Sequence, residues 1–131
     1  MSPKTVETLL SEARSELRRL EAPEASSALA SGALLVDIRA ESQRERDGVV
    51  PGALFIPRNV LEWRCDPRSQ WRDERAADPG RRLIVMCDEG FQSSLAAAIL
   101  RQLGLERATD LIGGFQAWRA AGLPVTLESA P

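Results

Sequence analysis

The sequence predicts an α/β fold in which a parallel sheet is covered by helices on both faces. Two apolar segments, residues 33–38 (ALLVDI) and 82–87 (RLIVMC), run on without alternating with polar residues. Continuous apolar runs of this length are typical of strands buried on both faces. Segments with helical spacing separate the strand-like segments, and this alternation favours parallel strands joined by helical crossovers.

The N-terminal region predicts two helices. Apolar residues recur every three or four positions over roughly residues 4–20, as in an amphipathic helix. Members of this stripe are Val6, Leu9, Leu10, Ala13, Leu17 and Leu20. Pro23 ends this helix, and a short second helix follows up to Gly32. We divide the chain into an N-terminal amphipathic extension, residues 1–21, and a domain, residues 22–131. An isolated helix of this length is marginal in water, so its apolar face should be covered.

The middle of the chain is less regular. A polar, charged stretch, residues 39–48 (RAESQRERDG), leads to the turn VPGA and the short apolar run ALFIP. Residues 58–64 (RNVLEWR) predict a helical turn, and the prolines and glycine that follow indicate an irregular linker.

The C-terminal part predicts a helix, a strand and a last short helix. Residues 93–104 (SSLAAAILRQLG) form the first helix, with a serine cap and a glycine stop. Residues 108–114 (ATDLIGG) predict a strand and a turn, and residues 115–122 (FQAWRAAG) a final helix.

Composition excludes several classes of function. The chain has 131 residues, 44% of them apolar and 27% charged, which fits one globular domain with a real core. Its net charge of −2 argues against nucleic acid or an acidic membrane as the main partner. Neither a secretory signal nor an apolar run of about 20 residues is present, so we expect a cytoplasmic protein.

The absence of histidine limits the possible chemistry. It excludes Ser-His and Cys-His pairs and any histidine-ligated metal. Only Cys65 and Cys87 remain as thiols, and they form no C-x-x-C motif. We therefore predict no metal site and no dithiol oxidoreductase.

Cys87 is the candidate nucleophile. It stands between a buried strand and a helix that begins near Ser93, so residues 87–92 must form a tight loop in which Gly90 permits a positive φ. Successive N–H groups of such a loop can form an anion-binding nest in front of the helix N-terminus, which stabilises a thiolate. The alternative is a cysteine that is simply buried in the core.

Four stretches, in this order, resemble the motifs of a single-domain rhodanese. They are LLVDIR (34–39), GVVPGA (48–53), the Cys87 loop, and GGFQAW (113–118) with AGLPV (121–125). The resemblance implies a parallel sheet of about five strands and sulfur transfer through a cysteine persulfide, without a cofactor. The partners that it implies are a sulfur donor and a thiol acceptor, either small molecules or proteins, with neither nucleic acid nor membrane; the oligomeric state stays open.

The resemblance also assigns residues. Cys87 becomes the catalytic sulfur acceptor, in an active-site loop made of Asp88, Glu89, Gly90, Phe91 and Gln92. Positions that match the structural motifs are Asp37, Arg39, Pro51, Gly52, Gly113, Gly114 and Trp118.

The loop departs from the family pattern in its charge. Many active rhodaneses carry a basic residue in this loop, whereas this chain has Asp88 and Glu89, which leaves thiosulfate open as a substrate. Arg58 and Arg64 are candidates for binding an anionic substrate, although surface arginines usually only solvate a helix.

Two further classes compete with a sulfurtransferase. A non-catalytic module could use the same fold for binding or regulation. A phosphatase or arsenate reductase would need a longer loop that ends in an arginine, and the chain has Ser93 at that position. We expect a sulfurtransferase because the loop begins with a cysteine.

Overall fold

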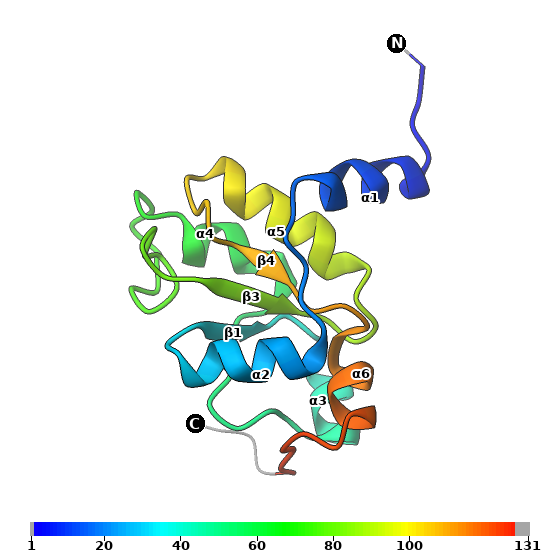
Figure 1. Ribbon diagram of the computed structural model, residues 1–131. Helices are drawn as coiled ribbons and strands as arrows, with labels where there is room; N and C mark the ends of the chain where they lie inside the picture. The colour runs from blue at the N-terminus through cyan, green and yellow to red at the C-terminus, as the bar shows by residue number, and fades with distance from the viewer. Residues whose placement is uncertain (1, 128–131) are drawn as a thin grey trace.

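The predicted α/β class is confirmed by the computed structural model, which describes residues 2–127. Its sheet is parallel, with the strand order β2-β1-β3-β4 (Figure 1). The four strands are β1 (Leu34–Asp37), β2 (Leu54–Phe55), β3 (Leu83–Met86) and β4 (Thr109–Asp110). A single parallel bridge between Leu20 and Leu111 extends the edge beyond β4, which is the nearest equivalent of a fifth strand.

Helices cover both faces of this sheet, with α4 and α5 on one face and α2 and α6 on the other (Figure 1). The helical segments are α1 (Val6–Ser15), α2 (Ala22–Ala30), α3 (Glu41–Asp47), the 3₁₀ turn η1 (Arg58–Val60), α4 (Leu61–Cys65), α5 (Gln92–Gln102) and α6 (Gly114–Ala120).

The central strand β3 divides its side chains between two apolar layers. Leu83 and Val85 join the layer under α4 and α5, whereas Ile84 and Met86 join the layer under α2 and α6. All four side chains are fully buried, which explains the continuous apolar run in the sequence. Cys87 follows in the same alternation, so it lies on the α5 side of the sheet.

The N-terminal helix is shorter than its apolar stripe suggests. α1 ends at Ser15, and Leu20 instead pairs with Leu111 at the sheet edge. α1 packs against α5 and buries Ala13, but Val6 and Leu9 stay exposed. The expected burial of this stripe therefore holds only for its C-terminal part, and the division at residue 21 stays a prediction.

The structure contains one helix that the sequence did not predict, and it corrects one predicted helix cap. The charged stretch after β1 contains the helix α3, which buries none of its side chains and so lacks the apolar stripe by which helices are recognised. The start of α3 is fixed by a local hydrogen bond, in which the backbone N–H of Ala40 donates to the Gln43 side chain (3.1 Å). Ser93 and Ser94 do not cap α5: they lie inside its first turn, where both are buried.

Within the described residues, none of the helices has the length and apolar character that crossing a membrane requires.

Candidate active site

Cys87 lies at the carboxyl end of β3, at the centre of the sheet. In open parallel sheets, ligands bind beyond this end of the strands. The residue is 5% exposed, and it contributes to the lining of a hollow of about 240 Å³. The hollow is lined by Arg39, Gln43, Cys87, Asp88, Glu89, Phe91 and Gln92.

The thiol of Cys87 accepts hydrogen bonds from two backbone N–H groups. The distances to its Sγ atom are 3.2 Å from the nitrogen of Gly90 and 3.4 Å from that of Ser93. Gly90 has a φ of +90°, and Ser93 belongs to the first turn of α5, so a nest and a helix N-terminus both face the sulfur. This arrangement favours a negative charge on Sγ without a neighbouring base.

The carbonyl groups at the start of the loop point away from the sulfur. Phe115 N–H donates to the carbonyl of Cys87 (2.9 Å) and Gln116 N–H donates to that of Asp88 (3.1 Å), so the first turn of α6 fixes both carbonyls. This contact requires glycine, because a Cβ on Gly114 would lie 2.5 Å from the Cys87 carbonyl oxygen, and one on Gly90 would lie 2.7 Å from the nitrogen of Gly113. The glycines of the predicted motifs thus bring two backbones together.

A buried carboxylate supports the loop from behind. Asp110, fully buried at the end of β4, accepts hydrogen bonds from the hydroxyls of Ser93 (2.7 Å) and Ser94 (2.8 Å). Arg19 forms an ion pair with the same carboxylate (2.8 Å). Arg19 and Asp110 belong to none of the predicted motifs, and the two serines were expected to cap α5, although an acid inside an apolar strand was a usable signal for a buried polar network.

Asp37 and Arg39 form a buried ion pair beside the hollow. The guanidinium donates to both carboxylate oxygens (3.1 and 2.9 Å) and to the carbonyl of Gly48 (2.9 Å), and it stacks 3.9 Å from the ring centre of Phe115. The pair therefore joins β1 to α3 and α6. Arg39 also lines the hollow, and within the described part of the chain its Nη1 has no hydrogen-bond partner.

The side chains of the two acids in the loop, Asp88 and Glu89, have partners other than the sulfur of Cys87 or face solvent. Asp88 accepts a hydrogen bond from the Gln116 amide (2.9 Å), which also donates to Asp47 (3.1 Å). Glu89 is exposed. Both acids line the hollow and add negative charge to it, while the hydrogen bonds to Sγ within residues 2–127 come from backbone N–H groups.

Arg58 and Arg64 are not among the residues that line the Cys87 hollow. Arg58 pairs with Glu62 of the same helical region (2.8 Å), and Arg64 donates to the carbonyl of Trp71 (2.7 Å). The structure thus does not bring them together with Cys87, and a substrate-binding role stays a prediction.

The other residues of the predicted motifs shape a turn or pack in the core. Pro51 and Gly52 form an exposed turn before β2, with φ +82° at the glycine. Trp118 is buried, and its Nε1 donates to the carbonyl of Pro124 (2.9 Å), which anchors the segment after α6.

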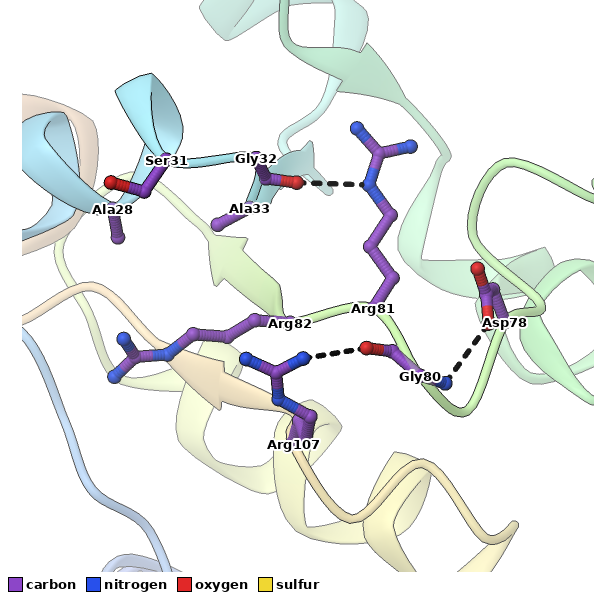
Figure 2. A pocket seen from close by; sticks show the side chains of 9 residues that line it. All are labelled: Ala28, Ser31, Gly32, Ala33, Asp78, Gly80, Arg81, Arg82 and Arg107. Atoms are coloured by element: carbon purple, nitrogen blue, oxygen red, sulfur yellow. Dashed lines mark hydrogen bonds between the residues drawn. The ribbon is translucent and has the colours of Figure 1, made fainter.

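A larger hollow, of about 500 Å³, lies at the opposite ends of the strands, beside the residues that precede β1 and β3. Figure 2 shows two arginines of this hollow engaged with backbone carbonyls, whereas Arg82 is drawn without such a contact: Arg81 donates to Gly32 (3.3 Å) and Arg107 to Gly80 (2.6 Å). Its lining contains no cysteine. The smaller Cys87 hollow is therefore the candidate active site.

Cys65 is not a second reactive thiol at neutral pH. It is fully buried at the end of α4, and burial, reinforced by the charges of Asp73 and Glu62, raises its pKa to about 12. Both cysteines are free thiols.

Comparisons with known proteins agree with the predicted family. Residues 21–121 match the family described as "Rhodanese-like domain". A sulfurtransferase of Allochromatium vinosum is 34% identical over 92 residues, which are 70% of this chain and 77% of that protein. A thiosulfate sulfurtransferase, GlpE, of Pseudomonas fluorescens is 31% identical over 117 residues, which are 89% of this chain and 98% of that protein.

A solved structure shares the whole fold. A Rhodopseudomonas palustris protein of unknown function, described as a possible tyrosine phosphatase, is 32% identical with a TM-score of 0.87. The alignment covers 96% of this chain and 97% of that one. The present chain belongs to the rhodanese-like family of sulfurtransferases.

The first prediction separates the two thiols. Near pH 7, iodoacetamide should modify Cys87 and leave Cys65 unmodified in the native protein. With a pKa of about 12, Cys65 is a thiolate in only about one molecule in 10⁵ at this pH. Peptide mass spectrometry before and after unfolding in guanidinium chloride measures this. Cys87 should be labelled in both states, and Cys65 only after unfolding. Rapid native labelling of Cys65 would contradict the assignment.

Proposed function

We propose that this protein transfers sulfane sulfur through a persulfide at Cys87. The observation that carries this proposal is the pair of backbone N–H donors, from Gly90 and Ser93, on the sulfur at the end of β3. Such donors stabilise a thiolate before the reaction and an anionic persulfide after it. Membership of the rhodanese-like family supports the same chemistry.

The proposed reaction has two displacement steps. The Cys87 thiolate attacks the outer sulfur of the donor, a new S–S bond forms, and the donor's own S–S bond breaks with its electron pair leaving on a thiolate or sulfite. An acceptor thiolate then attacks the terminal sulfur of the Cys87 persulfide. The Cys87 thiolate leaves, so the enzyme returns to its starting state and the acceptor carries the sulfur.

The charges around the hollow bear on the choice of donor. Asp88 and Glu89 carry negative charge at the lining, and Arg39 is the basic residue among the residues that line it. A dianion such as thiosulfate therefore meets net repulsion. We propose that less charged persulfide or polysulfide donors are preferred, with a small-molecule or protein thiol as acceptor.

A phosphatase mechanism has less support. The phosphatase hypothesis applied to the Rhodopseudomonas palustris protein would require an arginine at the end of the loop, to bind the oxyanion. This chain has Ser93 there, and its hydroxyl is already engaged with Asp110 (2.7 Å).

The second prediction concerns the intermediate. Incubation with a sulfane-sulfur donor should raise the intact mass by one sulfur atom, and dithiothreitol should reverse the change. Cys87→Ser should abolish it, whereas Cys65→Ser, the matched control at the other thiol, should retain it. If every donor leaves the mass unchanged, the chain is instead a non-catalytic binding or regulatory module.

The third prediction concerns the two acids. Asp88→Asn with Glu89→Gln should raise kcat/KM for thiosulfate, because each removes a charge that repels the dianion. For one carboxylate and one unit charge of the donor about 8 Å apart, removing the repulsion changes the rate roughly two- to thirty-fold. Exposure of the loop to solvent places the effect near the lower value. Added salt should help the wild type more than the double variant.

The matched control for the charge removal is Glu74→Gln with Glu106→Gln, two exposed acids outside the hollow lining. This double variant has the same net charge as the active-site variant and should leave the rate unchanged. Equal rates in both double variants and in the wild type, with no salt effect, would show that the loop acids do not select the donor.

A further inference from the structure

The carbonyl group of Gly90 is held by two arginines from the N-terminal segment. Nη2 of Arg14 lies 2.8 Å and Nη2 of Arg19 lies 3.0 Å from this oxygen. Both arginines precede the segment that matches the rhodanese-like domain, residues 21–121. The active-site loop thus depends on contacts from outside the matched region.

Each of these arginines is oriented by a second contact. Nε of Arg14 donates to the hydroxyl of Ser94 (3.1 Å), and Arg19 binds both oxygens of Asp110 (2.8 and 3.2 Å). Because Asp110 is fully buried, the Arg19 guanidinium is held against the protein, with only 16% of its side chain exposed. The two cations therefore approach Gly90 in a defined geometry rather than as mobile surface groups.

The position of this carbonyl decides what the sulfur meets. The N–H of Gly90 faces Sγ of Cys87 (3.2 Å), while its carbonyl faces the arginines in the opposite part of the loop. Gly90 has no side chain, so the torsion angle that sets the direction of its carbonyl is less restricted by sterics than in other residues. The carbonyls of Cys87 and Asp88 are fixed by α6, whereas the short hydrogen bonds to that of Gly90 come from Arg14 and Arg19, with a longer one (3.5 Å) from the hydroxyl of Ser94.

The charges favour a role beyond attachment of the helix. Two guanidinium groups on one carbonyl oxygen repel each other unless negative charge lies nearby. Asp110 neutralises Arg19, whereas Arg14 forms no ion pair among the described residues. A negative charge on Cys87, at the other side of the same loop, would balance the positive charge of Arg14.

We infer that Arg14 and Arg19 are positioning residues for Cys87, which hold the Gly90 carbonyl away from the sulfur so that the loop presents N–H groups to it. The inference rests on the proposed role of Cys87 as the sulfur carrier. Without these arginines the carbonyl keeps only the long contact from the Ser94 hydroxyl (3.5 Å) and can turn toward the sulfur, where its negative end disfavours the thiolate and the persulfide.

The test measures the rate of Cys87 alkylation by iodoacetamide as a function of pH in the full-length protein. Arg14→Met retains the methylene stem and removes the guanidinium, and Arg19 with Asp110 is left intact. The pH of half-maximal rate should rise by about half a unit or more, the direction expected when a positive charge and aligned dipoles are lost. Arg14→Lys should restore part of the shift.

Arg18→Met is the matched control, because Arg18 is an exposed arginine of the same segment and, in the described structure, it donates no hydrogen bond to the loop. It should leave the pH profile unchanged. If Arg14→Met lowers the melting temperature but leaves the pH profile of Cys87 at the wild-type position, the arginine only anchors α1 and the inference is wrong. A profile for Arg18→Met shifted as far as that for Arg14→Met would also contradict it.

Alkylation reads the thiol directly and needs no sulfur donor. Suppose that the wild type forms no persulfide, but the pH profile of Cys87 alkylation shifts in Arg14→Met. This result would overturn the proposed function and leave the positioning role standing. If the wild type forms a persulfide, but the pH profile does not shift in Arg14→Met, the proposed function stands and the positioning role is wrong.

Discussion

The direction of the peptide groups in the Cys87 loop is the constraint on which the site depends. N–H groups of Gly90 and Ser93 point at the sulfur, and the carbonyls of Cys87, Asp88 and Gly90 are each bonded elsewhere. An inward carbonyl would place a negative dipole against an anion, so outward bonds are needed for the site to hold one. Much of the structure near the loop supplies those bonds: the first turn of α6, the glycines that allow its close approach, and the arginines of the N-terminal segment.

This arrangement explains how acidic side chains can follow a nucleophilic cysteine. Backbone dipoles act on the sulfur at 3.2 and 3.4 Å, whereas the Asp88 carboxylate is engaged with Gln116 and Glu89 faces solvent. Positive charge lies behind the loop, on Arg14 and Arg19, and negative charge lies at its lining. Thiolate stability and donor selection can therefore be set by different groups in one small site.

The features that sequence reasoning predicted share a local signature. β1 and β3 were predicted because strands buried on both faces have continuous apolar runs, and the Cys87 loop because a strand, a glycine and a helix leave only a few residues for the turn. α3 was missed because it buries nothing, and the serines were misassigned as a cap because their partner, Asp110, lies on another strand. The roles of Arg14 and Arg19 depend on contacts across more than 70 positions of the chain, which no local pattern records.

The most direct test of the loop geometry is a pH titration of backbone amide signals by ¹H–¹⁵N NMR spectroscopy. The amide protons of Gly90 and Ser93 should move downfield together as Cys87 ionises, because a thiolate strengthens both hydrogen bonds. The change should have one common midpoint and should be absent in Cys87→Ser. Amide signals of Gly90 and Ser93 that do not respond to the ionisation of Cys87 would contradict the account, because the sulfur would then not be held by the loop.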